Sequence, residues 1–94
     1  MAVMVRIFHV SLGRILATPG VLEVTTAAER SIALNRHSHG DWGDVVGEDW
    51  KANDRALQIG GRLLSVYHTL NGTKFWIITE ADRSATTILL PQEY

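Results

Sequence analysis

The stretch from Gly61 to Pro91, GRLLSVYHTLNGTKFWIITEADRSATTILLP, decides the fold. Runs rich in Val, Ile, Thr and aromatic residues alternate with turn residues, a pattern typical of consecutive strands. Asn71-Gly72 is a dipeptide favoured by the type I′ turn, in which both central residues have positive φ. We therefore expect a three-stranded antiparallel meander, with a tight hairpin at Asn71-Gly72 and a four-residue loop from Ala81 to Ser84.

These turns predict which residues lie opposite each other. The first hairpin then has the pairs His68 with Phe75, Val66 with Ile77, and Leu64 with Thr79. The second has the pairs Phe75 with Leu90, Ile77 with Ile88, and Thr79 with Thr86. Because side chains alternate between the two faces of a strand, all of these residues share one face. We expect that face to be the core.

The other face of the predicted sheet is a mixture of aromatic, hydroxyl and aliphatic side chains: Leu63, Ser65, Tyr67, Trp76, Ile78, Glu80, Ala85, Thr87 and Leu89. This face either binds a partner or lies under the rest of the chain. The candidate binding residues on it are Tyr67, Trp76, Ile78 and Glu80. Asp82 and Arg83 at the loop tip join them, because loops held by a rigid sheet are favoured contact sites, although a solvated turn explains the tip as well.

The amino-terminal part predicts a strand or a hairpin followed by irregular structure. The runs Val3 to Val10 and Arg14 to Thr18 are rich in β-forming residues. Thr18 and Pro19 are a helix cap and a first helical residue, but the Val21 to Thr26 segment is rich in β-branched residues. We expect a single turn there at most.

Two helices follow. Thr26 and Glu29 have the spacing of a capping box, which predicts a helix from Ala27 to His37. A second helix is expected from Val46 to Ile59, where Gly60-Gly61 ends it. Residues 1–94 thus form a single domain of the α+β class, with two helices packed on one face of an antiparallel sheet.

Composition excludes several classes of protein. The 94 residues include nine basic and ten acidic side chains, so the net charge of -1 gives no overall basic bias toward duplex nucleic acid. The absence of cysteine excludes disulfides, thiolate catalysis and zinc sites with cysteine ligands. No apolar run approaches about 18 residues, and Met1 to Val10 resembles a strand more than a signal peptide. A cytoplasmic protein without a membrane segment is expected, and nucleic-acid binding stays open.

The segment from His37 to Gly43 is a polar loop with two histidines. His37, His39 and Asp41 have the residue types of a divalent-metal site, but their spacing is weakly specific, and a polar loop whose histidines are solvated or cap the preceding helix explains it better. We therefore expect neither metal nor cofactor. Trp42 in this loop either packs in a small core or contributes to a binding surface.

A second group of residues matches the needs of a small α+β ribonuclease, which are a general base, a general acid and a cation. Arg62, Tyr67 and Arg83 supply the cations and a phenol. The predicted register sends His68 to the core face, away from Glu80, so a catalytic histidine has to come from elsewhere, for instance His37. The alternative catalytic set is therefore Arg62, Tyr67, His37 and Arg83.

Several motifs resemble a family of small hypothetical proteins from bacterial plasmids, integrative elements and prophages, some labelled only "plasmid-related". The motifs are LGRILATPG from Leu12, HxxGDWGD from His37, ANDRAL from Ala52, GRLLSxY from Gly61 and WIITEADRSxTTILLPxEY from Trp76. The resemblance covers most of the chain and implies no established activity. The order of strand, helices and three strands is also similar to RelE/ParE toxins and barnase-like nucleases, in topology only.

Two functional hypotheses follow. The first is a non-enzymatic accessory protein of a mobile genetic element that binds a host or element-encoded protein, for example as an anti-defence, anti-CRISPR-like inhibitor. The second is a RelE-like or barnase-like ribonuclease or RNA-binding toxin. A sheet face bearing Trp76 and Ile78 would also suit a homodimer.

Overall fold

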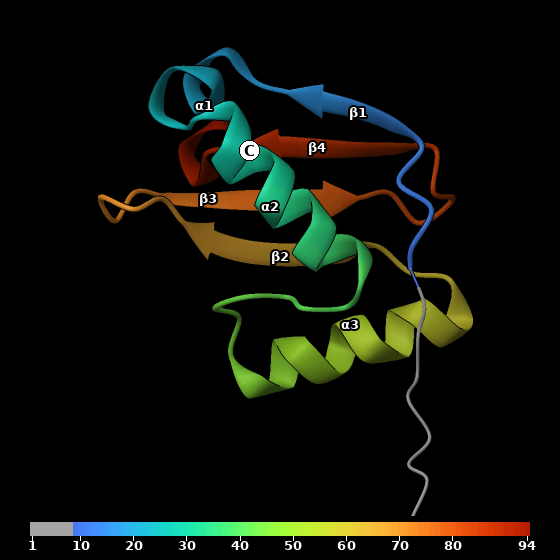
Figure 1. Ribbon diagram of the computed structural model, residues 1–94. Helices are drawn as coiled ribbons and strands as arrows, with labels where there is room; N and C mark the ends of the chain where they lie inside the picture. Colours follow the sequence, from blue (N-terminus) through green and yellow to red (C-terminus); the bar gives the residue numbers. More distant parts are fainter. Residues whose placement is uncertain (1–8) are drawn as a thin grey trace, which may run out of the picture.

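A computed structural model describes residues 9–94 as a four-stranded sheet with helices around it (Figure 1). The strands are β1 (Arg14–Ala17), β2 (Leu63–His68), β3 (Lys74–Thr79) and β4 (Ala85–Leu89). The helices are α1 (Pro19–Val24), α2 (Ala27–Ser38), α3 (Gly47–Ile59) and the short 3-10 helix η1 (Pro91–Glu93). The predicted α+β class is confirmed.

The sheet is mixed, whereas the sequence predicted an antiparallel one. Its strand order is β1-β4-β3-β2, with β2, β3 and β4 pairing antiparallel in sequence order. β1 pairs parallel with β4, and the long connection that a parallel pair requires consists of the three helices together with β2 and β3. The part of the predicted amino-terminal strand or hairpin that falls before His9 lies outside the described residues.

The predicted register of the first hairpin is wrong by one residue. β2 and β3 pair as Leu63 with Thr79, Ser65 with Ile77, and Tyr67 with Phe75. The loop has three residues, because Thr69 and Thr73 flank it and the Thr69 N–H donates to the Thr73 carbonyl at 2.9 Å. Gly72 has φ of +90°, whereas Asn71 is not among the residues with positive φ, so a type I′ turn is not formed. The Thr69 hydroxyl stabilises the longer loop by accepting from the Thr73 N–H at 2.9 Å.

A slip of one residue moves every side chain of β2 to the opposite face. Face A, as the structure has it, consists of Leu63, Ser65, Tyr67, Phe75, Ile77, Thr79, Thr86 and Ile88, with Ile15 and Ala17 from β1. Face B consists of Leu64, Val66, His68, Lys74, Trp76, Ile78, Thr87 and Leu89, with Arg14 and Leu16 from β1. The predicted pairs Ile77 with Ile88 and Thr79 with Thr86 are confirmed.

Face A forms the main core with α1 and α2. Val21 of α1 and Ala33 of α2 pack with Phe75, Ile77 and Ile88. The first turn of α2 is held as predicted, because the Thr26 side chain accepts from the Glu29 N–H and the Glu29 carboxylate accepts from the Thr26 N–H. α1 is a six-residue helix that begins with Thr18 as its cap, so the segment after Pro19 is more helical than predicted.

α3 lies beside the outer edge of β2 (Figure 1). Ala56 packs with Trp42, Leu63 and Val10 in a second, smaller core. Asn53, which the sequence placed on the apolar stripe of this helix, donates to the Leu64 carbonyl at 2.7 Å and accepts from the Leu64 N–H at 3.1 Å. Two residues further along the edge, Val66 bonds to the backbone of the Trp42 to Asp44 loop. The edge of β2 is thus hydrogen-bonded at both positions.

Replacing Asn53 by Ala is expected to leave both edge groups of Leu64 without a protein partner. Asn53 is buried, so the cost should be about 2 to 3 kcal/mol of unfolding free energy, measured by urea denaturation. Asn35→Ala, an exposed asparagine on α2, is the control and should change the stability little. Equal stability of the two variants would contradict the role of Asn53.

Candidate functional site

A chain of buried polar side chains crosses the centre of face A. His37 of α2 lies between two strands, with Nδ1 at 2.5 Å from Ser65 Oγ and Nε2 at 2.8 Å from Thr79 Oγ1. Thr79 Oγ1 is 2.7 Å from Thr86 Oγ1, and Thr86 Oγ1 donates to the Leu12 carbonyl at 2.7 Å. The Trp42 ring packs edge-on against His37 at 5.5 Å. The chain therefore joins α2, three strands and the segment before β1.

The direction of three of the four hydrogen bonds in this chain follows from its last member. A carbonyl only accepts, so Thr86 donates to Leu12, and Thr79 must then donate to Thr86. Thr79 Oγ1 accepts in turn from His37, which places a proton on Nε2. At neutral pH the lowered pKa of His37 leaves Nδ1 without a proton, so Nδ1 accepts from the Ser65 hydroxyl. This is a neutral imidazole. Burial, with a smaller contribution from the charge of Arg83, lowers the pKa of His37 to about 4.

His37 is neutral and hydrogen-bonded through both ring nitrogens, so its role is structural. Neither ring nitrogen is free to accept a proton from a substrate or to bind a metal, and the residue is fully buried. The place of His37 in the alternative catalytic set therefore has no geometric support.

The residues of the candidate metal site do not converge. His39 is exposed and its Nδ1 lies 2.7 Å from the Asn35 carbonyl at the end of α2. Asp41 pairs with Arg36 through two contacts of 2.7 and 3.2 Å, which lower the pKa of this carboxyl. Among residues 9–94, no group of three His, Asp or Glu side chains is arranged to hold a metal ion.

Two aromatic residues predicted for a binding surface are buried instead. Tyr67 lies on face A because of the register slip, and its hydroxyl donates to the Asp41 carbonyl at 2.5 Å. Burial raises the pKa of Tyr67 to about 12, so its hydroxyl stays protonated at neutral pH and keeps the bond to Asp41. Trp42 is fully buried in the second core and donates from Nε1 to Asp54 at 3.0 Å.

Arg83 ties the loop between β3 and β4 to α3. Its guanidinium donates to the carbonyls of Gly61 at 2.5 Å, Glu80 at 3.1 Å and Ala56 at 3.3 Å. The residue also has φ of +63°, a conformation that is rare outside glycine. Asp82 at the tip accepts from the Ser84 N–H. Interaction with the Ser84 side chain and with this N–H lowers the pKa of Asp82. Arg83 thus has a structural role, and it lies on a different element from His37 and Tyr67.

Face B carries an aromatic groove of about 290 Å³. Its lining residues are Arg62, Leu64, Trp76, Ile78 and Tyr94. Trp76 and Tyr94 contact edge to face at 5.8 Å. Arg62 lies over the Tyr94 ring at 5.3 Å, donates to its hydroxyl at 2.7 Å, and has Glu80 3.7 Å away. The candidates Trp76, Ile78 and Glu80 therefore come together as predicted for one face, and Arg62 belongs with them.

Tyr94 is the functional candidate that sequence analysis did not identify. It follows the Pro91 turn at the end of the sequence, where no strand or helix periodicity indicates its direction. Its position comes from η1, which turns the chain back over β3.

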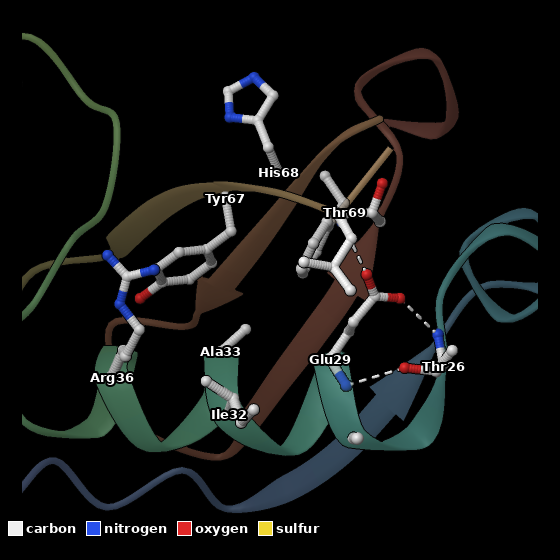
Figure 2. A pocket seen from close by; sticks show the side chains of 11 residues that line it. Thr26, Glu29, Ile32, Ala33, Arg36, Tyr67, His68 and Thr69 are labelled. Atoms are coloured by element: carbon white, nitrogen blue, oxygen red, sulfur yellow. Dashed lines mark hydrogen bonds between the residues drawn. The ribbon is translucent and has the colours of Figure 1, made fainter. Parts of the chain in front are cut away.

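A second groove of about 330 Å³ lies between α2 and the first hairpin (Figure 2). Ile32 and Leu70 form its exposed apolar rim. Figure 2 shows Arg36 over the Tyr67 ring, where the guanidinium carbon is 4.8 Å from the ring centroid. Glu29 joins the two sides, because its carboxylate accepts from the N–H groups of Thr26 and Leu70. His68 points out of this groove and lies 2.7 Å from Asp44.

Comparison with family models, curated proteins and solved structures finds no match to this chain. Within residues 9–94, no helix is both long and apolar enough to cross a membrane. Function therefore has to be inferred from the chain's own side chains.

Acid is expected to unfold this protein partly through His37. The pKa of His37 is about 4 in the folded state, against 6.5 for an unperturbed histidine, so stability is present above pH 6.5 and falls as the pH drops toward 4. Between pH 7.5 and 4.5 the wild type should lose about 2 to 3 kcal/mol more unfolding free energy than His37→Gln, which does not titrate. Urea denaturation at both pH values measures this difference.

The control for this comparison is His39→Gln, which removes an exposed histidine. It should keep the pH dependence of the wild type. The role of His37 would be contradicted if His39→Gln, and not His37→Gln, flattened the profile.

Proposed function

We propose that this protein is a non-enzymatic accessory protein of a mobile genetic element that binds a host or element-encoded protein through face B. The observation that carries the proposal is the groove between Trp76, Tyr94 and Arg62. Trp, Tyr and Arg are the residue types most enriched among the side chains that dominate protein interfaces. An anti-defence inhibitor is one such accessory role, and the mobile-element setting rests on the sequence motifs.

Face B is better suited to a partner than the groove beside α2. Trp76 and Ile78 lie on β3, an inner strand with neighbours on both sides, so the groove floor is rigid. The rim of the other groove is formed by Ile32 and Leu70, and leucine is under-represented among the residues that dominate interfaces. Arg62 and Glu80 also give the rim of face B a charged pair that complementary charges of a partner can meet.

The ribonuclease alternative has less support from the geometry. Its four residues divide between the buried side of the sheet, where His37 and Tyr67 lie, and the separate positions of Arg62 on face B and Arg83 against α3. A general base and a cation facing one substrate would have to come from other residues. The non-enzymatic proposal therefore expects intact RNA after incubation with the purified protein.

The double variant Trp76→Ala with Tyr94→Ala is expected to lose the partner. Tagged wild-type protein would first be used to isolate the partner from the native host, with identification by mass spectrometry. Titration of the purified partner should then show binding weakened by about thirtyfold or more, since truncation of a dominant interface residue costs about 2 kcal/mol. Circular dichroism would establish that the variant is folded.

The matched control is Val46→Ala with Ile59→Ala, which removes two exposed apolar side chains at the ends of α3. It should bind like the wild type. A folded Trp76 and Tyr94 double variant that retains every partner of the wild type would overturn the proposal.

A further inference from the structure

β1 is the outermost strand of the sheet and has backbone groups that face away from it (Figure 1). Its bonds to β4 use alternate residues, since the Arg14 N–H donates to Ser84 and the Thr18 N–H to Ile88, both at 3.0 Å. The N–H and C=O groups of the intervening residues, Ile15 and Ala17, therefore point outward. Within residues 9–94, no strand pairs with this edge.

The two edges of the sheet differ in whether their outward backbone groups are hydrogen-bonded. On the β2 edge, Leu64 and Val66 are hydrogen-bonded by Asn53 and by the Trp42 to Asp44 loop. β1 is short and begins with the charged Arg14, but it has neither a proline nor a bulge to prevent pairing at this edge. Instead it exposes apolar side chains on both faces, with Ile15 53% and Leu16 42% accessible. This edge has the properties of one that receives another strand.

We propose that a second copy of this chain pairs with β1 as an antiparallel strand, with Ile15 opposite Ala17 of the second copy. A two-fold axis then passes between the two Leu16 residues. This register uses all four outward groups of each β1, because Ile15 and Ala17 exchange both of their hydrogen bonds. A register with Ile15 opposite Ile15 would leave the groups of Ala17 unpaired. The two sheets join into one of eight strands.

Charge complementarity favours a second copy as the occupant. The same register places Arg14 opposite Thr18 of the second copy. The Thr18 hydroxyl donates to Glu93, whose carboxylate also accepts from the Gly20 N–H. Arg14 is exposed and has no ion pair within residues 9–94. The pairing therefore brings Arg14 of each copy toward the Glu93 carboxylate of the other copy, which gives two such contacts in each dimer.

The run from Val3 to Val10 is rich in β-forming residues, so by composition it is another candidate for this edge. Val10, which precedes β1, packs with Trp42 and Leu63 beside β2, at the other edge of the sheet. A second copy is not tethered beside β2 in this way, so it can approach the β1 edge freely. Pairing within one chain, or with a strand of another protein, remains an outcome that the experiment distinguishes.

Cysteine cross-linking tests the register directly, since the chain has no cysteine of its own. In the proposed pair the two Leu16 residues face each other at a non-hydrogen-bonded position, with Cα atoms about 4.5 Å apart. This distance is within the range for a disulfide. Full-length Leu16→Cys should therefore form a covalent dimer under mild oxidation. Ile15→Cys, one residue away and more exposed, faces Ala17 and should stay uncross-linked.

Self-association of the full chain is the second measurement. Sedimentation of the wild type should give twice the mass of one chain, and Leu16→Arg should weaken the dimer roughly tenfold or more by placing two like charges at the axis. Leu22→Arg, an equally exposed leucine on α1, is the control and should remain dimeric. The proposal is overturned by a monomeric wild type, by a dimer that tolerates Leu16→Arg, or by cross-linking of Ile15→Cys in place of Leu16→Cys.

Discussion

The buried hydrogen bonds from Ser65 through His37, Thr79 and Thr86 to the Leu12 carbonyl fix how the helices sit on the sheet. His37, Thr79 and Thr86 each donate one bond and accept another, and Ser65 donates one, so none can move without leaving a buried polar group unpaired. Such a group costs about 1 to 3 kcal/mol, which is a large part of the stability of a small domain. The rotation of α2, the register of three strands and the path of the chain before β1 are therefore coupled.

This coupling explains why one hairpin was predicted correctly and the other was not. The polar run from Ala81 to Ser84 separates two apolar strands, and the four-residue loop expected from it is the one observed, so the register of this hairpin followed from the sequence. Asn71-Gly72 is compatible with two loop lengths, and the pattern of apolar residues in β2 does not choose between them. The choice is made by Thr69, which stabilises the longer loop, and by Ser65, which reaches His37 only in the observed register. Both effects come from specific side-chain hydrogen bonds, which the periodicity of apolar residues does not predict.

The same distinction applies to the candidate site. Trp76 and Ile78 were assigned to one face correctly, because the alternation within β3 does not depend on the first hairpin. Tyr67 depends on that hairpin, and it moved into the core with the register. The helix caps were predicted because the Thr26 and Glu29 signal is local. Tyr94 was missed because its position depends on a tertiary contact with Trp76.

The two proposed surfaces are geometrically related. A two-fold axis between antiparallel strands of one sheet is perpendicular to that sheet, so face B of both copies lies on the same side of the dimer. The two β3 strands are separated by five inter-strand spacings, about 24 Å. The two Leu16 side chains lie on face B between them. A partner with two-fold symmetry can therefore contact both Trp76 grooves at once, which raises its overall affinity without any new contact in either groove.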